Sequence, residues 1–257
     1  NSKEQHIASS PLQLVKCHSE DGNCCHLVQL KHCYDLSLLY GDNYGYRSSL
    51  NGSMRAHLQE KVEKILSYNL LKAGDLVIDI GSNDGTTLSF YPPQYQLLGV
   101  DPTAKKFREF YPEHVNVIED FFSQSKVDKV LPNKKARVIT SFSMFYDLED
   151  PLLFMREIYN LLDEDGIWVT EQSYLPTMLS QNSFDTICHE HLEYYSLTTI
   201  HWMCDQVGLK LVDFELNDIN GGSISLVVAK QKASVSAEKI EKVNAQLAYE
   251  KRLGILD

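Results

Sequence analysis

One apolar run that ends in a glycine turn constrains the fold of this chain more than any other feature. Residues 76–80, Leu-Val-Ile-Asp-Ile, are almost continuously apolar, as in a strand that is buried on both faces of a parallel sheet. Gly81 follows at once and Gly85 four residues later, and glycine permits a sharp turn and a close approach of the backbone. The pattern predicts a strand, a turn and a helix at the start of an α/β domain.

Similar strand patterns recur along the chain and alternate with helical patterns. We expect strands at residues 95–100, 115–118, 136–141, 167–171, 209–213 and 223–229, and helices at 53–70 and 151–162. Strands that are separated by helices form a mainly parallel, doubly wound sheet of the Rossmann-like class. The last two strands would close this sheet as an antiparallel hairpin.

The sequence divides into three expected parts. Residues 1–50 form a small Cys/His-rich module, residues 51–232 the α/β domain, and residues 233–257 the helical start of a C-terminal region. Four of the six cysteines, Cys17, Cys24, Cys25 and Cys33, fall in the first part. Such a cluster in a protein of the cytosol indicates metal binding before disulfide formation.

Charge and hydropathy exclude several classes of partner. The net charge is −11, and neutralising nucleic-acid phosphates requires clustered Lys and Arg, so we expect no nucleic-acid partner. No apolar run reaches the roughly 18 residues of a membrane span, and the first residues lack the pattern of a signal peptide. A cytoplasmic protein that does not contact membranes is therefore expected; the sequence does not indicate its oligomeric state.

The residues of the glycine turn indicate which ligand the turn can bind. A dinucleotide fingerprint has glycines where Asn83 and Thr86 stand here, and the Gly-Lys-Ser/Thr of a P-loop is missing. A ligand without phosphates, with an amino-acid head and an adenosine, fits better. The spacing Asp-x-Gly-x-x-x-Gly resembles motif I of Rossmann-like S-adenosylmethionine methyltransferases. We expect contacts with this cofactor from Asp79, Gly81, Asn83 and Gly85.

Residues after the next three strands extend this cofactor site. Asp101 closes the second strand, where an acidic side chain can accept hydrogen bonds from both ribose hydroxyls. Asp120 and Phe121 follow the third strand; in such methyltransferases an acid there often meets the adenine amine and an aromatic ring packs on the base. Ser141 ends the fourth strand and would line the same crevice.

Two histidines and a carboxylate occur together after the fifth strand, as His189-Glu190-His191. Imidazole titrates near neutral pH, so one histidine could take a proton from carbon or oxygen. Glu190 could orient a ring or hold a substrate hydroxyl, and the hydroxyls of Tyr194 and Tyr195 could polarise a carbonyl. Metal ligation by the two histidines, and structural histidines that bond to the backbone, stay open as alternatives.

Six short segments together resemble one known family. At residues 25–30, 44–49, 54–58, 81–85, 184–191 and 220–223 the sequence resembles the sugar C-methyltransferases, which methylate C3 of nucleotide-linked 4-keto-deoxysugars. The resemblance implies S-adenosylmethionine as cofactor and a nucleotide-linked sugar as small-molecule substrate. It also implies that His191 is the general base and that Tyr46, His189 and Glu190 lie near the sugar.

The resemblance further implies an N-terminal module that binds structural zinc, here through Cys17, Cys24 and Cys25. The implied reaction itself needs no metal. The C4 ketone acidifies the C3 proton, a base removes it, and the enolate attacks the methyl group of the cofactor, so the protein supplies positioning and proton transfer.

The sequence departs from the family pattern in two places near the expected site. Cys188 stands where the family has a tyrosine, and Asn220 stands where histidine often precedes Gly-Gly-Ser. Two other hypotheses therefore stay open: an O- or N-methyltransferase of another small molecule, and a member that binds the cofactor without catalysis. Asn83 and Thr86 disfavour an oxidoreductase.

Overall fold

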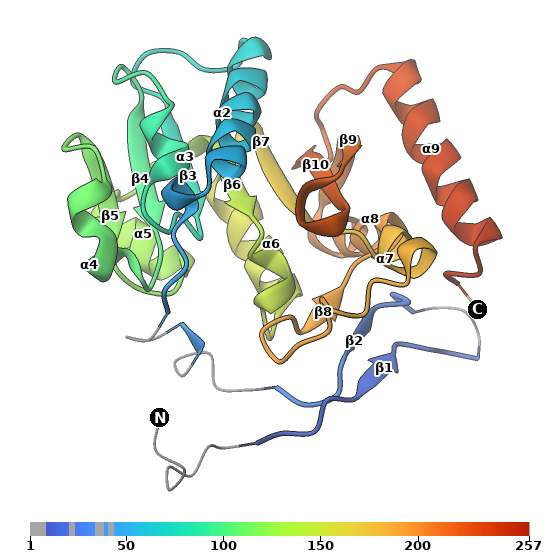
Figure 1. Cartoon of the computed structure of the whole chain (residues 1–257). Coiled ribbons are helices and arrows are strands. Elements are labelled where there is room, and N and C mark those ends of the chain that lie inside the picture. Colours follow the sequence, from blue (N-terminus) through green and yellow to red (C-terminus); the bar gives the residue numbers. More distant parts are fainter. Residues whose placement is uncertain (1–8, 21–23, 34–38, 41–43, 257) are drawn as a thin grey trace, which may run out of the picture.

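Buried apolar strands form the centre of the molecule. The computed structural model describes residues 9–20, 24–33, 39–40 and 44–256. Seven strands form one sheet in the order β5-β4-β3-β6-β7-β10-β9 (Figure 1). Their bounds are β3 Leu76–Ile80, β4 Gln96–Val100, β5 Val115–Ile118, β6 Ala136–Phe142, β7 Leu162–Ser173, β9 Leu209–Asn217 and β10 Ser223–Lys230.

The pairing of these strands confirms the predicted fold class. β3 to β7 pair in parallel, whereas β10 runs antiparallel to both β7 and β9. The result is a mainly parallel, doubly wound sheet that an antiparallel hairpin closes, as in Rossmann-like methyltransferases. β7 is the element that differs most from the prediction, because it begins at Leu162 directly after the preceding helix and not at residue 167.

Helices cover both faces of the sheet. They are α2 Gly52–Ser67, α3 Thr86–Ser89, α4 Ala104–Phe107, α5 Gln124–Val130, α6 Pro151–Leu161, α7 Leu175–Gln181, α8 Leu197–Val207 and α9 Ala237–Arg252. Neighbouring residues of β3 point to opposite faces, so Val77 joins the cluster that contains Ile65 of α2, and Ile78 joins the one that contains Ile158 of α6. The core therefore has two layers with the sheet between them.

A buried carboxylate fixes α2 on the sheet. Glu171 of β7 accepts hydrogen bonds from Lys61 of α2 at 2.7 Å and from Asn217 of β9 at 2.8 Å. His57 Nε2 lies 2.5 Å from its other oxygen. Buried ionised groups are costly unless paired, and here three partners from two other elements surround the charge.

A second carboxylate joins the last helix to the core. Glu250 of α9 is fully buried and accepts from the backbone N–H groups of Leu197 and Thr198, each at 2.7 Å, at the start of α8. A carboxylate at a helix N-terminus satisfies N–H groups that have no partner within the helix. Residues 237–252 thus pack against α8 and β9, although the sequence placed them in a separate C-terminal region.

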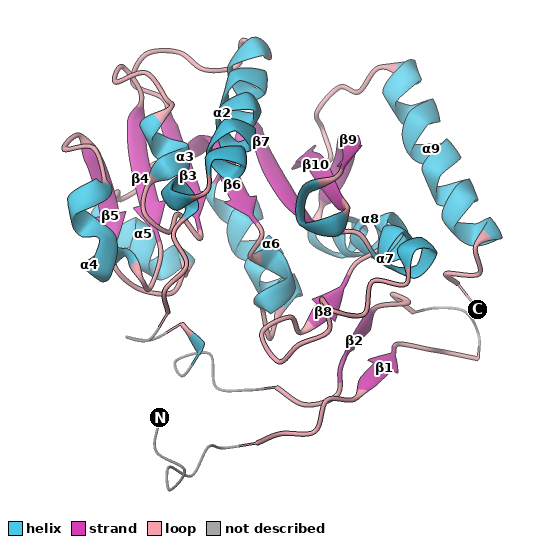
Figure 2. Cartoon of the chain, in the orientation of Figure 1, coloured by secondary structure: helices cyan, strands magenta, loops and turns pink. Residues whose placement is uncertain are grey.

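Two short strands near the N-terminus form a small sheet with a strand from much later in the chain. β1 Leu14–Lys16 pairs with β2 Val28–Leu30, and β2 pairs with β8 Glu193–Tyr194, all antiparallel (Figure 2). This pairing brings the first part of the chain beside the segment that follows His191. In the described part of the chain, no helix combines the length and apolarity that crossing a bilayer demands.

Candidate active site

A large cavity opens where the parallel strands end. β3 leads to β4 on one side and the chain later returns to β6 on the other, so the crevice between β3 and β6 is a topological switch point, the usual ligand site of such sheets. The cavity there has a volume of about 720 Å³, in the range of small-molecule sites. Its walls come from the ends of β3, β4 and β6, from Tyr40, Tyr44 and Tyr46, from Tyr146 and Asp147, and from Asp185, Thr186 and His191.

The glycine turn has a backbone that other residues would strain. Gly81 and Gly85 have φ angles of 74° and 77°, in the left-handed region. A Cβ atom at Gly85 would also lie 2.7 Å from the ring of Tyr111, and one at Gly81 would lie 2.9 Å from Met144 Cγ. Asn83, with a φ of 49°, is of the residue type that tolerates this region best after glycine. Gly81 and Asn83 line the cavity, whereas Gly85 shapes the turn from behind.

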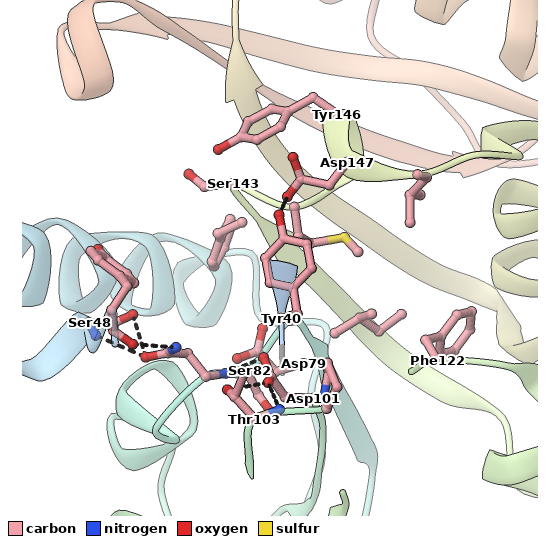
Figure 3. A pocket seen from close by; sticks show the side chains of 18 of the residues that line it. Tyr40, Ser48, Asp79, Ser82, Asp101, Thr103, Phe122, Ser143, Tyr146 and Asp147 are labelled. Carbon is pink, nitrogen blue, oxygen red and sulfur yellow. Dashed lines mark hydrogen bonds between the residues drawn. The ribbon is translucent and has the colours of Figure 1, made fainter. Parts of the chain in front are cut away.

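Asp101 lies at the end of β4 and braces the turn (Figure 3). One carboxylate oxygen accepts the N–H of Asn83 at 2.8 Å, and the other accepts the N–H and the hydroxyl of Thr103 at 2.7 and 2.5 Å. The side chain lines the cavity. Each carboxylate oxygen has two lone pairs, so Asp101 can still accept from a ligand hydroxyl while it holds the turn.

Asp79 is completely buried at the floor of the cavity. The Thr140 hydroxyl donates to its carboxylate at 2.6 Å. Burial raises the pKa of Asp79 to about 7, and the charge of Asp101 acts in the same direction. A cation that enters the cavity near this carboxylate would favour its ionised form.

The segment before α2 is held onto the glycine turn by side chains of that turn. Asn83 Oδ1 accepts the N–H of Ser48 at 3.0 Å, and Asn83 Nδ2 donates to the carbonyl of Tyr46 at 3.1 Å. Asp84 accepts the N–H of Ser49 and lies 3.5 Å from Arg47 Nε. These bonds place the Tyr46 side chain on the cavity wall, where the sequence expected it near the substrate.

Asp147 has one carboxylate oxygen that is paired and one that is not. The Tyr40 hydroxyl donates to Asp147 Oδ2 at 2.6 Å (Figure 3), but the buried Oδ1 atom has no hydrogen-bond partner among the residues that the structure describes. Burial raises the pKa of Asp147 to about 8, so the side chain is largely neutral at pH 7 and can donate a hydrogen bond. An unpaired buried polar atom is costly, and a ligand in the cavity would be its natural partner.

His191 lines the opposite wall and is firmly held. Its Nδ1 lies 2.8 Å from the carbonyl of Thr186, and its ring contacts Tyr146 edge to face with centroids 4.5 Å apart. Burial lowers the pKa of His191, but the hydrogen bond and charge of Cys188, the carbonyl of Thr186 and the charge of Asp147 together outweigh burial and raise the pKa to about 9. The hydrogen bond with His191 lowers the pKa of the Cys188 thiol. The two side chains therefore share one proton and together can accept a second.

The other sequence-predicted catalytic residues lie outside the cavity wall. His189 Nε2 lies 2.9 Å from the carbonyl of Ser10, so this ring meets the N-terminal segment. Glu190 is exposed to solvent. Among the described residues, the cavity wall thus includes Tyr46 and His191 but neither His189 nor Glu190.

Two further expected cofactor residues do not line the cavity. Phe121 is part of its wall, but Asp120 is not, and the carboxylate of Asp120 is paired with Lys126 at 2.8 Å. Ser141 is fully buried within the sheet and its hydroxyl accepts from Trp168 at 2.9 Å. The wall at the end of β6 comes from the next two residues, Phe142 and Ser143. Side chains alternate along a strand, and a shift of one position changes the face.

The N-terminal cysteines do not form a metal site in the described residues. Cys24 Sγ donates to the carbonyl of Cys17 at 3.7 Å and lies 3.6 Å from His26 Nδ1, while Cys25 contacts Cys17. No three ligand atoms from this group come close enough to share an ion in the part of the chain that the structure describes. The structural zinc that the family resemblance implies therefore stays a prediction.

Sequence reasoning missed Tyr40 and Asp147. Asp147 had a detectable signal, because it follows the end of a predicted strand, where the cavities of parallel sheets lie. Tyr40 had none, because its hydrogen bond joins residues 107 positions apart in a segment without regular periodicity.

Comparison with known proteins gives the same fold. A family model described as a methyltransferase domain matches residues 54–213. The chain is 31% identical over 247 residues to the C-methyltransferase NovU of Streptomyces niveus, and this match covers 95% of the chain and 57% of NovU. The chain thus spans little more than half the length of this relative.

Two solved structures are similar over most of the chain. YcgJ from Bacillus subtilis has a TM-score of 0.53 at 18% identity, with 69% of this chain and 100% of that one covered. An S-adenosylmethionine-dependent methyltransferase from Clostridium acetobutylicum has a TM-score of 0.50 at 15% identity, with 67% and 90% covered. At these identities the two structures support the fold alone.

Proposed function

This chain belongs to the methyltransferase domain family and is an S-adenosylmethionine-dependent methyltransferase, and from this premise we propose that it methylates a carbon atom of a nucleotide-linked 4-keto-deoxysugar. The similarity to a C-methyltransferase supports transfer to carbon. The observation that carries the proposal is that His191 lines the same cavity as the glycine turn, so a proton acceptor faces the expected methyl donor.

The cofactor would occupy the half of the cavity beside the glycine turn. Asp101 would accept a hydrogen bond from a ribose hydroxyl, Gly81 would allow close backbone approach, and Phe121 would pack on the adenine. The buried carboxylate of Asp79 would face the cationic end of the molecule. When bound, S-adenosylmethionine supplies an electrophilic methyl group.

The substrate would occupy the half between Asp147 and His191. The Cys188–His191 pair would take the C3 proton, since it holds one proton and has room for a second. Asp147, held by Tyr40, would donate a hydrogen bond through its unpartnered oxygen to the C4 carbonyl and would stabilise the enolate. Tyr46 would close the cavity from the side of the turn.

An exchange experiment tests this mechanism directly. Purified protein is incubated in D₂O with nucleotide-linked 4-keto-6-deoxysugars, first without and then with S-adenosylmethionine, and the products are analysed by mass spectrometry and NMR. We expect exchange at C3 without the methyl donor and a new C–CH₃ group with it. Methylation of oxygen or nitrogen without C3 exchange would reject carbon transfer in favour of an ordinary O- or N-methyltransferase.

The cytoplasmic location expected from the sequence is a separate prediction, which cell fractionation would test.

A further inference from the structure

Three side chains beside the cavity bring together the ligand types of a zinc site. The Sγ of Cys188, a carboxylate oxygen of Glu190 and a ring nitrogen of His191 all lie within 4.8 Å of one another. In tetrahedral zinc sites, neighbouring ligand atoms are about 3.3–3.8 Å apart. Glu190 is exposed, so its side chain can rotate to close the remaining gap.

The orientation of His191 is the second observation. Its Nδ1 is engaged with the backbone carbonyl of Thr186 at 2.8 Å, so Nδ1 carries a hydrogen, and Nε2 is the nitrogen that can bind a metal once it releases its own proton. Histidines that bind metals usually donate their other ring N–H to a carbonyl or a carboxylate in this way, which fixes the tautomer. Contact with Tyr146 further restrains the ring.

The ligand types select the metal. Magnesium and calcium prefer oxygen ligands, whereas thiolate with imidazole is typical of zinc. Three protein ligands would leave a fourth position for water, and one of the three, His191, lines the substrate half of the cavity. We propose that Cys188, Glu190 and His191 form a binding site for Zn²⁺, and that zinc bound there reversibly inhibits the enzyme.

Inhibition follows from the chemistry of the ligands and rests on the proposed function of His191. Zinc takes the Nε2 lone pair and the thiolate, and the proton that Cys188 and His191 share passes to solvent. The pair then has no position for the substrate proton. The cofactor half of the cavity, including Asp101, lies on the other wall and should still bind S-adenosylmethionine.

Cobalt is a suitable probe for the first half of this proposal, because its thiolate complexes absorb in the near ultraviolet. The chelator-treated full chain is titrated with Co²⁺, and Zn²⁺ affinity is measured by competition with a chromophoric chelator. We expect the variants Cys188→Ser and His191→Asn each to bind one Co²⁺ ion fewer per chain than wild type and to lack the thiolate absorption band of that ion. Glu190→Gln should still bind the metal, but at least tenfold more weakly. Cys25→Ser is the matched thiol control and should keep that equivalent. Equal metal content and spectra in wild type and Cys188→Ser would overturn the site.

The second half of the proposal, reversible inhibition by zinc, is tested by measuring the rate of methyl transfer. Zinc should inhibit the wild type at concentrations that saturate the site, and chelator should restore the rate. For the Cys188→Ser variant, inhibition is measured relative to the variant's own rate without metal. The zinc concentration that inhibits it should be at least tenfold higher than for wild type. Full activity of zinc-loaded wild type would overturn inhibition even with the metal bound. Because cobalt binding needs no substrate, a failure of the proposed reaction does not affect the binding result.

Discussion

The two walls of the cavity differ in how completely their polar groups are paired. On the cofactor wall both oxygens of Asp101 have partners, and Asn83 is bonded through its backbone and its side chain. On the substrate wall Asp147 Oδ1 has no partner among the described residues, and the Cys188–His191 pair shares a single proton. The polar groups of the cofactor wall are thus held by protein partners, whereas the substrate wall keeps a buried oxygen without one.

This difference assigns different tasks to the walls. A wall whose hydrogen bonds are complete holds its shape and can present fixed contacts to a cofactor that is common to many enzymes. A wall with an unpaired buried oxygen beside a coupled Cys–His pair is poised for proton transfer, as is typical of catalytic sites. Substitutions on the substrate wall should therefore change kcat, and those on the cofactor wall should change cofactor affinity.

The largest effect is expected at His191. The His191→Asn variant keeps a polar side chain but cannot accept the substrate proton, so kcat should fall about 100- to 10,000-fold. Binding of S-adenosylmethionine, measured by calorimetry on metal-free protein, should stay within about threefold, since the cofactor contacts lie on the other wall. A variant that retains the wild-type kcat would remove His191 from the proton transfer.

Asp147 should have the next largest effect, and two variants separate its roles. Asp147→Ala removes the donor to the substrate oxygen, so kcat should fall about 100- to 1,000-fold. Asp147→Asn keeps a donor and can still accept from Tyr40, so we expect it to retain about a tenth or more of the wild-type kcat. Equal loss in both variants would show that a carboxyl group itself is needed, and would contradict a role as hydrogen-bond donor.

Asp101 should affect affinity and leave kcat almost unchanged at saturating cofactor. Asp101→Asn exchanges an acceptor oxygen for a donor nitrogen, so S-adenosylmethionine should bind about 10- to 100-fold more weakly in calorimetry. Asp120→Asn is the matched control at the next strand end. Its carboxylate is exposed and paired with Lys126, so affinity should change less than about threefold. If Asp120→Asn weakened cofactor binding more than Asp101→Asn did, Asp120 and not Asp101 would be the carboxylate that binds the cofactor.

The cofactor wall was largely predictable from the sequence, because its residues are local. Gly81 and Asn83 directly follow β3, and Asp101 ends the next strand, so strand patterns and one spacing were enough to place them. Ser141 shows the limit of this reasoning, because the periodicity predicts a strand end only to within a residue or two, and one residue reverses the side chain.

The substrate wall was predictable only in part, through the His189-Glu190-His191 cluster and the family resemblance. Its groups come from residues 40 to 191, and the antiparallel pairing of β2 with β8 is what brings the N-terminal segment beside His191. No periodicity or motif spacing encodes such a pairing. The cluster and the resemblance led to Tyr46 and His191, which line the cavity, but also to His189, which meets the backbone of Ser10, and to a zinc module that stays a prediction.

The smallest predicted effect is the pH dependence of cofactor binding on the cofactor wall. Burial raises the pKa of Asp79 to about 7, and a cationic ligand stabilises the ionised carboxylate. S-adenosylmethionine should therefore bind more tightly as the pH rises, by about tenfold between roughly pH 6 and pH 8, and should level off above the pKa. Asp79→Asn should flatten this dependence in calorimetry. Burial raises the pKa of Asp101 as well, and Asp147 and His191 line the same cavity with raised pKa values, so a slope that remains in the variant comes from these other groups. If wild type itself showed no pH dependence, Asp79 would be a structural carboxyl that the cofactor does not sense, and the cofactor wall would be complete without it.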